Sequence, residues 1–483
     1  MKPHGANMTP ERLILRLLPG LLAGLICLAP GLASAGEADL GALVDEALRN
    51  NPELQSAQAQ VESGRHRVPQ ASALPDPSVS LGYTNEGLQK YTYGNSFDSV
   101  WAVTFSQPVP FPGKLVQKSR VAGRDVDVLQ AQLGSLRLQT AAKVKEIYFD
   151  LFLAHRTLAI LQDKMGLLEQ AEKAALARYA SGLGEQRDAV TAQTEKYLVL
   201  ERLEMARQKI HALEGQLNAQ LGREVMTPVA EPAEPPKAPY GKSLEELLAK
   251  ASLDSPDVVT DQKRLERAQT KVSAAKQEFF PDVTLSVGYA NKGFKASQAP
   301  PATDPNTSGP SGQAQRWTDM WSAGVSVSIP LYFWTKQAEG LKESKSDLYA
   351  AQRDLENVKN MTASAIRENY TALKAAERLA DLYASGTIPK TRQDVQLALA
   401  DYGAGKGDMA GVVLRLRGLL DSEVQYWTQL VEKNKAEARL ESLVGSAEGI
   451  RAASAALVRA PQPGATAASG EDTQHSINHP TNK

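Results

Sequence analysis

The stretch LPDPSVSLGYTNEG at residues 74–87 and the stretch WAVTFSQPVPFPGK at residues 101–114 decide the fold. Apolar residues occupy every second position over residues 79–83 and again over residues 101–105, with Ser, Gly, Ala or Thr between them. An alternation of period two is typical of a β-strand with one apolar face. We therefore expect two neighbouring strands here, between segments whose apolar residues follow a helical period.

The same pattern returns later in the chain, as PDVTLSVGYANKG at residues 281–293 and WSAGVSVSIPLYFWTK at residues 321–336. The offset between matching residues is steady, since pairs such as Tyr148 and Tyr370 lie 222 positions apart and matching residues further on lie 223 apart. A steady offset of this kind indicates an internal duplication.

Each repeat also contains long helical segments. Residues 113–179 are rich in Ala and Leu and contain no proline, which predicts a helix roughly 95 Å long at about 1.5 Å per residue. Two glycines in YASGLGEQRDAV, residues 179–190, interrupt this helix, and a second helix returns to residue 222. A helical hairpin of this length needs partner helices along its sides, as in a coiled-coil-like bundle.

The predicted fold class is mostly α with a small β part, a duplicated unit of long α-helical hairpins plus two β-hairpins. Five segments follow from the pattern. They are a signal peptide at 1–35, a first repeat at 36–222 with strands at about 78–107, a Pro-rich linker at 223–243, a second repeat at 244–445 with strands at about 282–329, and a mobile tail at 446–483.

The N-terminus has the three parts of a secretory signal. Arg12 and Arg16 precede an apolar run at residues 17–32, and Ala-Ser-Ala at residues 33–35 predicts cleavage before Gly36. An uncleaved anchor is the alternative, but about 16 apolar residues fall short of the roughly 20 that a spanning helix needs.

Cys27 is the only cysteine and lies inside that run, so cleavage leaves no thiol in the mature chain. Lipidation of Cys27 is the alternative, although Ile26 before it is bulkier than lipoprotein processing prefers. The formal charge is -1, so no basic excess suggests nucleic acid. His475 and His479 fit a solvated tail better than a metal site.

Four strands in one chain are too few to close a membrane-spanning barrel, which takes at least eight. Three copies would supply twelve, with Ser, Gly, Thr and Ala facing the lumen and the apolar residues facing lipid. A small soluble sheet packed on helices is the alternative. Aromatic residues near the strand ends favour the membrane, and they are Tyr83, Tyr91, Tyr93, Trp101, Tyr289, Trp317 and Trp321.

The duplication, the four strands and the Tyr-x-x-Gly hairpin tips resemble the TolC family of outer-membrane efflux channels, over residues 40–445. The segments LPDPSVSLGYTNEG and FSQPVPFPGKL further resemble the heavy-metal branch of that family, which serves copper/silver or cobalt-zinc-cadmium pumps. The resemblance implies a homotrimer, with a twelve-stranded barrel in the lipid of the outer membrane and a twelve-helix tunnel extending into the periplasm. It also implies a periplasmic adaptor and an inner-membrane pump of the resistance-nodulation-division class as partners.

The resemblance further implies that the hairpin tips contact the adaptor, and the Tyr-x-x-Gly pattern places these tips in the sequence. The residues concerned are Tyr179, Gly182, Leu183, Asp188 and Val190 in the first repeat, and Tyr402, Gly405, Lys406 and Val413 in the second. Glycine permits the tight reversal and the close approach of a partner backbone. The alternative is that these glycines only end helices.

Asp408 follows the second tip, and a trimer would present it three times around a narrow entrance. Carboxylates gathered there would attract cations, so Asp408 is a candidate gate residue. The alternative is an aspartate that caps the next helix.

The resemblance implies a passive conduit driven by the pump, and the sequence contains no P-loop, no HExxH, no paired Cys motif and no dinucleotide fingerprint. We therefore expect no enzyme, no cofactor and no metal site. His155 and His211 lie on long helices without a nearby ligand set, and the dispersed methionines fit core packing.

Four alternatives remain open at this point. The channel could carry organic compounds or drugs, or serve type I protein secretion. The chain could instead be a soluble periplasmic coiled-coil scaffold or an inner-membrane-anchored adaptor, but the duplicated strand pairs count against both.

Overall fold

The computed structural model describes residues 39–445 except residues 95, 97 and 294–317. The predicted signal peptide with Cys27, the predicted tail with its two histidines, and Trp317 lie outside the described residues.

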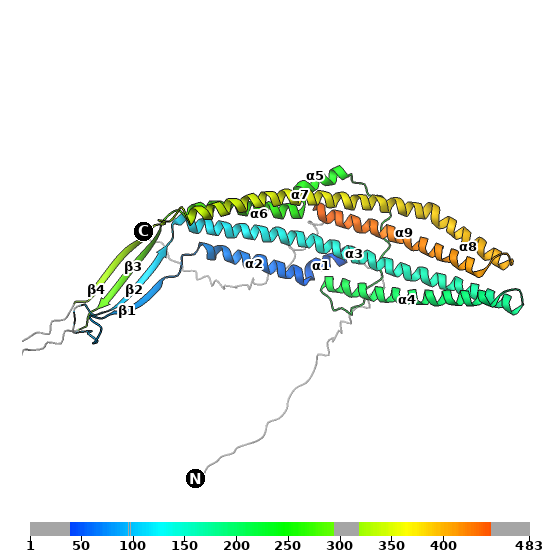
Figure 1. Cartoon of the computed structure of the whole chain (residues 1–483), viewed down its shortest axis with the longest axis horizontal. Coiled ribbons are helices and arrows are strands. Elements are labelled where there is room, and N and C mark those ends of the chain that lie inside the picture. Colours follow the sequence, from blue (N-terminus) through cyan, green and yellow to red (C-terminus); the bar gives the residue numbers. More distant parts are fainter. Residues whose placement is uncertain (1–38, 95, 97, 294–317, 446–483) are drawn as a thin grey trace, which may run out of the picture.

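The described chain is elongated, with helices along most of its length and a small sheet at one end (Figure 1). The elements, in chain order, are α1 (Leu40–Asn50), α2 (Pro52–Ser72), β1 (Ser78–Thr84), β2 (Val100–Val109), α3 (Pro112–Ala180), α4 (Gln186–Leu221), α5 (Leu244–Asp254), α6 (Pro256–Gln277), β3 (Asp282–Asn291), β4 (Met320–Ser328), α7 (Gln337–Leu382), the π-helix η1 (Tyr383–Thr387), α8 (Ile388–Gly403) and α9 (Met409–Val444). The mostly helical fold with a few strands, expected from the sequence, is confirmed.

The four strands form one antiparallel sheet in the order β1-β2-β3-β4. Its register places most of the large apolar residues of the four strands on one face, because Val79 lies opposite Phe105, and Phe105 lies opposite Val287. That face carries Val79, Leu81, Tyr83, Trp101, Val103, Phe105, Val283, Leu285, Val287, Tyr289, Trp321, Val325 and Val327. The other face consists mainly of Ser, Gly, Thr and Ala, and no helix of the described chain covers either face (Figure 1).

In the helical part, the C-terminal ends of α4 and α9 each meet the end of another helix. Gly222, in the left-handed conformation with φ 69°, ends α4 against the junction of α1 and α2, and a Cβ there would lie 2.6 Å from the carbonyl oxygen of Asn50. Gly445, with φ 65°, ends α9 in the same way, and a Cβ there would collide with the carbonyl oxygen of Asp254. These two glycines are 223 residues apart, so both junctions belong to the duplicated unit.

The change of offset from 222 to 223 residues has a structural cause. Tyr370 lies 222 residues after Tyr148, whereas Tyr402 lies 223 after Tyr179, so the second repeat holds one extra residue between these positions. The π-helix η1, Tyr383–Thr387, lies in this interval, and α3 continues through the equivalent part of the first repeat. A π-helical turn closes its hydrogen bond over one more residue than an α-helical turn, so it absorbs the insertion.

The predicted Pro-rich linker between α4 and α5 lies over the helices. Ala233 donates its backbone N–H to the hydroxyl of Tyr148 at 2.7 Å, and Asn434 donates its side-chain amide to the carbonyl of Pro236 at 3.3 Å. These bonds hold the linker against both repeats. Among the residues described, no helix is long and apolar enough to cross a membrane.

Candidate functional site at the hairpin tips

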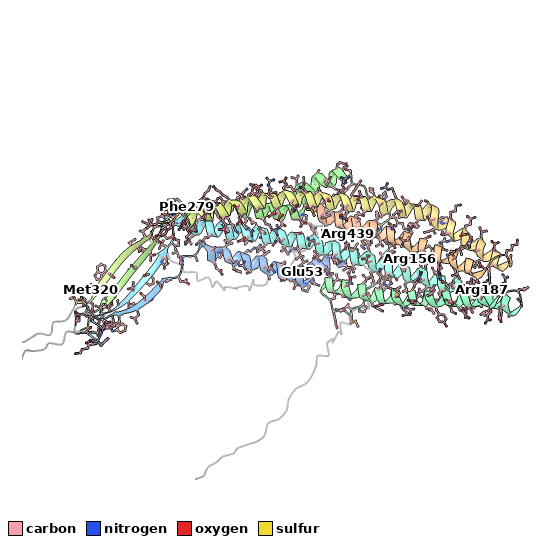
Figure 2. All side chains as sticks on the ribbon, in the orientation of Figure 1. Glu53, Arg156, Arg187, Phe279, Met320 and Arg439 are labelled. Atoms are coloured by element: carbon pink, nitrogen blue, oxygen red, sulfur yellow. The ribbon has the colours of Figure 1, made fainter. Side chains whose placement is uncertain are left out.

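Both helical hairpins turn at the end of the molecule that lies opposite the sheet (Figure 1). Figure 2 places Arg187 near this end and Phe279 where the helices meet the strands. The predicted tip residues of the two repeats therefore lie side by side, although more than two hundred positions separate them in the chain.

The first tip is a helix C-terminus closed by a glycine. Gly182 has φ 74° and donates its N–H to the carbonyl of Tyr179 at 3.0 Å, and Leu183 donates to the carbonyl of Arg178 at 2.9 Å. This pair of bonds is the Schellman arrangement, in which the left-handed residue lies three positions after the carbonyl that accepts its N–H.

The second tip repeats this geometry. Gly405 has φ 77° and donates to the carbonyl of Tyr402 at 3.1 Å, and Lys406 donates to the carbonyl of Asp401 at 2.9 Å. The Tyr-x-x-Gly spacing is therefore the spacing of a Schellman cap. The glycines therefore end their helices, as the alternative interpretation expects.

Arg178 joins the two tips. Its Nη1 donates to the carbonyl oxygen of Tyr402, and its Nη2 donates to the carbonyl of Leu183 at 3.2 Å. Its guanidinium also lies 4.7 Å from the centre of the Tyr402 ring, within the range of a cation–π interaction. One side chain thus holds both reversals together. Burial and the nearby Asp188 carboxylate raise the pKa of the Tyr402 hydroxyl.

The predicted contact residues divide into exposed and buried groups. Leu183 is 74% exposed, Val190 is 51% exposed and Tyr179 is 48% exposed, so these side chains are available to a partner. Tyr402 and Val413 are buried within the chain, at 3% and 5%. The backbone at Gly182, Gly405 and Lys406 is exposed, and Asp188 is half-buried.

A groove of about 450 Å³ runs between α4 and α9 behind the tips. Val190 and Val413, which are 223 residues apart and so equivalent in the two repeats, both line it. Its deeper end holds an ion pair, in which Arg417 Nε donates to a carboxylate oxygen of the buried Glu195 at 2.9 Å. This pair ties α4 to α9.

Asp408 lies at the start of α9 and caps it. Its Oδ1 accepts the backbone N–H of Gly411 at 2.9 Å, and its own backbone is extended, as expected of an N-cap residue. The capping alternative is therefore observed. Because the side chain remains exposed, its charge also faces solvent at the tip.

Sequence reasoning missed Arg178, Glu195 and Arg417. The sequence contained a signal for Arg178. This residue precedes the tyrosine of its tip, whereas Asp401 stands at the equivalent position of the second repeat. A reversal of charge between two repeats indicates that the position plays different parts in each. No group of three or more His, Cys, Asp or Glu side chains in the described part of the chain is arranged to hold a metal ion.

Comparison with known proteins identifies the family. The family model described as "Outer membrane efflux protein" matches residues 43–223 and 247–446, which is more than half of the chain. The chain belongs to the outer membrane efflux protein family. The resemblance to TolC-type channels is thereby confirmed, as is the prediction of an efflux component in the outer membrane.

Two curated relatives match more than half of the chain. The chain is 22% identical over 427 residues to the cobalt-zinc-cadmium resistance protein CzcC of Cupriavidus metallidurans, covering 85% of this chain and 91% of that protein. It is 26% identical over 318 residues to the probable outer membrane lipoprotein SilC of Salmonella typhimurium, covering 62% of each. Its fold is similar to that of CusC, with a TM-score of 0.64 and 18% identity over 85% of this chain and 92% of the other.

Proposed function

We propose that three copies of this outer membrane efflux protein close a twelve-stranded barrel in the outer membrane, with their helices forming a tunnel into the periplasm. One observation carries the proposal, namely the register that puts most of the large apolar residues of the four strands on a single uncovered face. Such a face suits lipid, and the opposite face of Ser, Gly, Thr and Ala suits a wet lumen. The end strands β1 and β4 each need a further strand to complete their pairing.

The proposed cargo is a heavy-metal cation, delivered by an inner-membrane pump of the resistance-nodulation-division class through a periplasmic adaptor. The name of the relative CzcC, a cobalt-zinc-cadmium resistance protein, supports this cargo. The chain acts as a passive duct and not as an enzyme. The pump selects the ion and supplies the energy, so the duct needs no metal site of its own.

The proposed contact with the adaptor is made by the exposed residues of the tips, of which Leu183 and Val190 have the most exposed apolar side chains. The two Schellman turns hold the tips rigid, and their glycines leave room for a partner backbone. The charge of Asp408 at the entrance is proposed to favour cations.

Deletion of the gene in its host tests the function. Without the channel, we expect growth to stop at a severalfold lower concentration of Zn²⁺, Cd²⁺, Co²⁺, Cu⁺ or Ag⁺. The wild-type gene is expected to restore the original tolerance. Sensitivity to solvents or drugs without metal sensitivity would assign the channel to organic compounds instead. A water-soluble monomer after cell fractionation would contradict the channel itself.

A variant of the tip tests the proposed adaptor contact separately. Leu183→Glu places a charge at a side chain that is 74% exposed, so the trimer is expected to assemble normally in the outer membrane while metal resistance is lost. Glu201→Gln, a change at an exposed residue of α4 away from the tip, is the control. Full resistance with Leu183→Glu would remove this residue from the contact.

A further inference from the structure

The place where β2 passes into α3 is fixed by contacts with the second repeat. Lys114 is almost fully buried, and its Nζ lies 2.9 Å from Oδ2 of Asp282 and 3.7 Å from a carboxylate oxygen of Glu278. Oδ1 of Asp282 accepts the backbone N–H of Phe111 at 2.9 Å. The Phe111 ring stacks on Phe280, with centroids 4.5 Å apart and planes inclined by 10°. These contacts seal the first repeat to the second at the base of the sheet.

The duplication supplies a counterpart for each main partner in this contact. Residues 222 positions after Phe111 and Lys114 are Phe333 and Lys336, an aromatic residue and a lysine again. The offset of 206 that relates GYTNEG to GYANKG takes Phe280 and Asp282 back to Leu74 and Asp76, an apolar residue and an aspartate again. The chain therefore carries the residue types of this contact twice.

Within one chain, the second set cannot meet. Phe333 and Lys336 follow β4, while Leu74 and Asp76 precede β1, and β2 and β3 lie between these two edges of the sheet. All four residues are exposed, with Leu74 at 53% and Phe333 at 49%. Neither Asp76 nor Lys336 forms an ion pair with another residue of the described chain.

We propose that Lys336 of each subunit forms a buried ion pair with Asp76 of the neighbouring subunit, and that Phe333 packs on the neighbour's Leu74. The inference rests on the proposed trimer and adds to it the residues that close each seam. The partner of the exposed β4 edge is a second copy of this chain, because that copy presents Asp76 and Leu74 at the start of its β1. Opposite charges at the two edges fit this pairing.

The duplicated lysine and aspartate are found where strands meet helices, and not at another ion pair between the repeats. A second ion pair joins the repeats further along the helices, where Arg124 Nη1 lies 3.0 Å from a carboxylate oxygen of Glu266. The residue 222 positions after Arg124 is Ser346, so that pair has no charged counterpart. Duplication alone therefore did not preserve every ion pair, and the retained Lys and Asp mark a contact that both seams use.

The same reasoning predicts a strand register across the seam, with the offset of 222 taken from the match of SQP at residues 106–108 to SIP at residues 328–330. Inside the chain, Ser106 of β2 lies opposite Ser286 of β3. Their counterparts are Ser328 of β4 and Ser80 of β1, by the offsets of 222 and 206. Ser328 is thus expected to lie directly opposite Ser80 of the neighbouring subunit.

Cysteine cross-linking of the whole protein in membranes tests the register. In a Cys27→Ser background, oxidation of Ser80→Cys with Ser328→Cys is expected to give covalent dimers and trimers on a non-reducing denaturing gel. Ser106→Cys with Ser286→Cys calibrates the yield, since it should close within one chain. Ser80→Cys with Ser326→Cys is the control that should stay unlinked, because a diagonal pair about 7–8 Å apart exceeds disulfide reach.

The ion pair is tested by exchanging its charges. Lys336→Asp and Asp76→Lys are each expected to lower the temperature at which the trimer separates on a gel, and the double exchange should recover at least half of the loss. A trimer that cross-links at Ser80 and Ser326, or shows no recovery in the double exchange, overturns the inference and leaves the trimeric channel standing. A monomeric protein in the membrane overturns both.

Discussion

Lys164 lies in the half of α3 nearer the hairpin tip, with its ammonium group inside the helix bundle. It is 5% exposed, and its Nζ finds no hydrogen-bond partner in the described part of the chain. Burial lowers the pKa of Lys164 to about 8, although Asp421, Glu195 and Glu423 act in the opposite direction. Between pH 8 and the ordinary value of 10.5 the unfolded chain binds more protons at this site than the folded chain does. The stability cost of the charge is thus complete below pH 8 and fades as the pH rises towards 10.5.

Lys164→Met is therefore expected to stabilise the protein at pH 7, by up to roughly 3 kcal/mol from a pKa difference of this size. The gain should shrink between pH 8 and 10.5. Thermal unfolding followed by circular dichroism in detergent, at a series of pH values, measures it. Lys173→Met, at an exposed position of the same helix, is the control and should change little. A lower melting temperature for Lys164→Met at pH 7 would mean that the ammonium group has a partner in the assembled protein.

Asp408 caps α9 and also carries a negative charge at the tip, and two substitutions separate these two roles. Asn keeps the oxygen that accepts the Gly411 N–H, so Asp408→Asn should leave stability unchanged and reduce the preference for cations. Asp408→Ala removes both properties and should also cost about 1 kcal/mol. Reversal potentials of the purified channel in a planar bilayer with a salt gradient measure the selectivity. Unchanged selectivity in Asp408→Asn would leave Asp408 as a cap only.

At the scale of the elements, the π-helix η1 interrupts the helix between α7 and α8. Because η1 absorbs one inserted residue, the helix on either side keeps the phase of an uninterrupted α-helix. Deletion of the exposed Ser385 should convert η1 to an α-helical turn, so the buried Val395 and Tyr402 keep their places. The exposed Gln393 lies outside η1, so its deletion should rotate every later residue of α8 about the helix axis by about 100°.

Assembly and thermal stability of the trimer distinguish these two deletions. The Ser385 deletion should assemble with a melting temperature close to that of the parent, while the Gln393 deletion should lose the packing of the second tip and fall by several degrees. Equal loss in both variants would show that η1 is not the site of the insertion.

Helices and strands were predictable because their apolar periods are long and uninterrupted. The two-residue alternation located β1 and β2, and the proline-free segment located α3. The π-helix was not predicted, although the offset of the repeats changed by one residue at the right place. The link between the tips was also missed, because the contact of Arg178 with Tyr402 depends on how two hairpins pack and no local pattern records that.

At the scale of the whole molecule, the sheet depends on assembly. Its apolar side chains are exposed in the single chain, with Val79 and Leu81 at 69% and Val325 at 70%. The described helices contact the sheet only at its base (Figure 1). A four-stranded sheet with both faces uncovered has little to stabilise it alone, so under the proposed trimer we expect its stability to come from neighbouring copies and lipid.

The sheet and the trimer are therefore expected to be lost together on heating. A gel run after stepwise heating reports the trimer, and the infrared amide I band reports the strands; the two midpoints should agree within the error of each method. Lys336→Asp should lower both midpoints by the same amount, because the seam it weakens holds the sheet as well as the subunits. A heated monomer that keeps its β signal would show instead that one chain can hold its four strands without its neighbours.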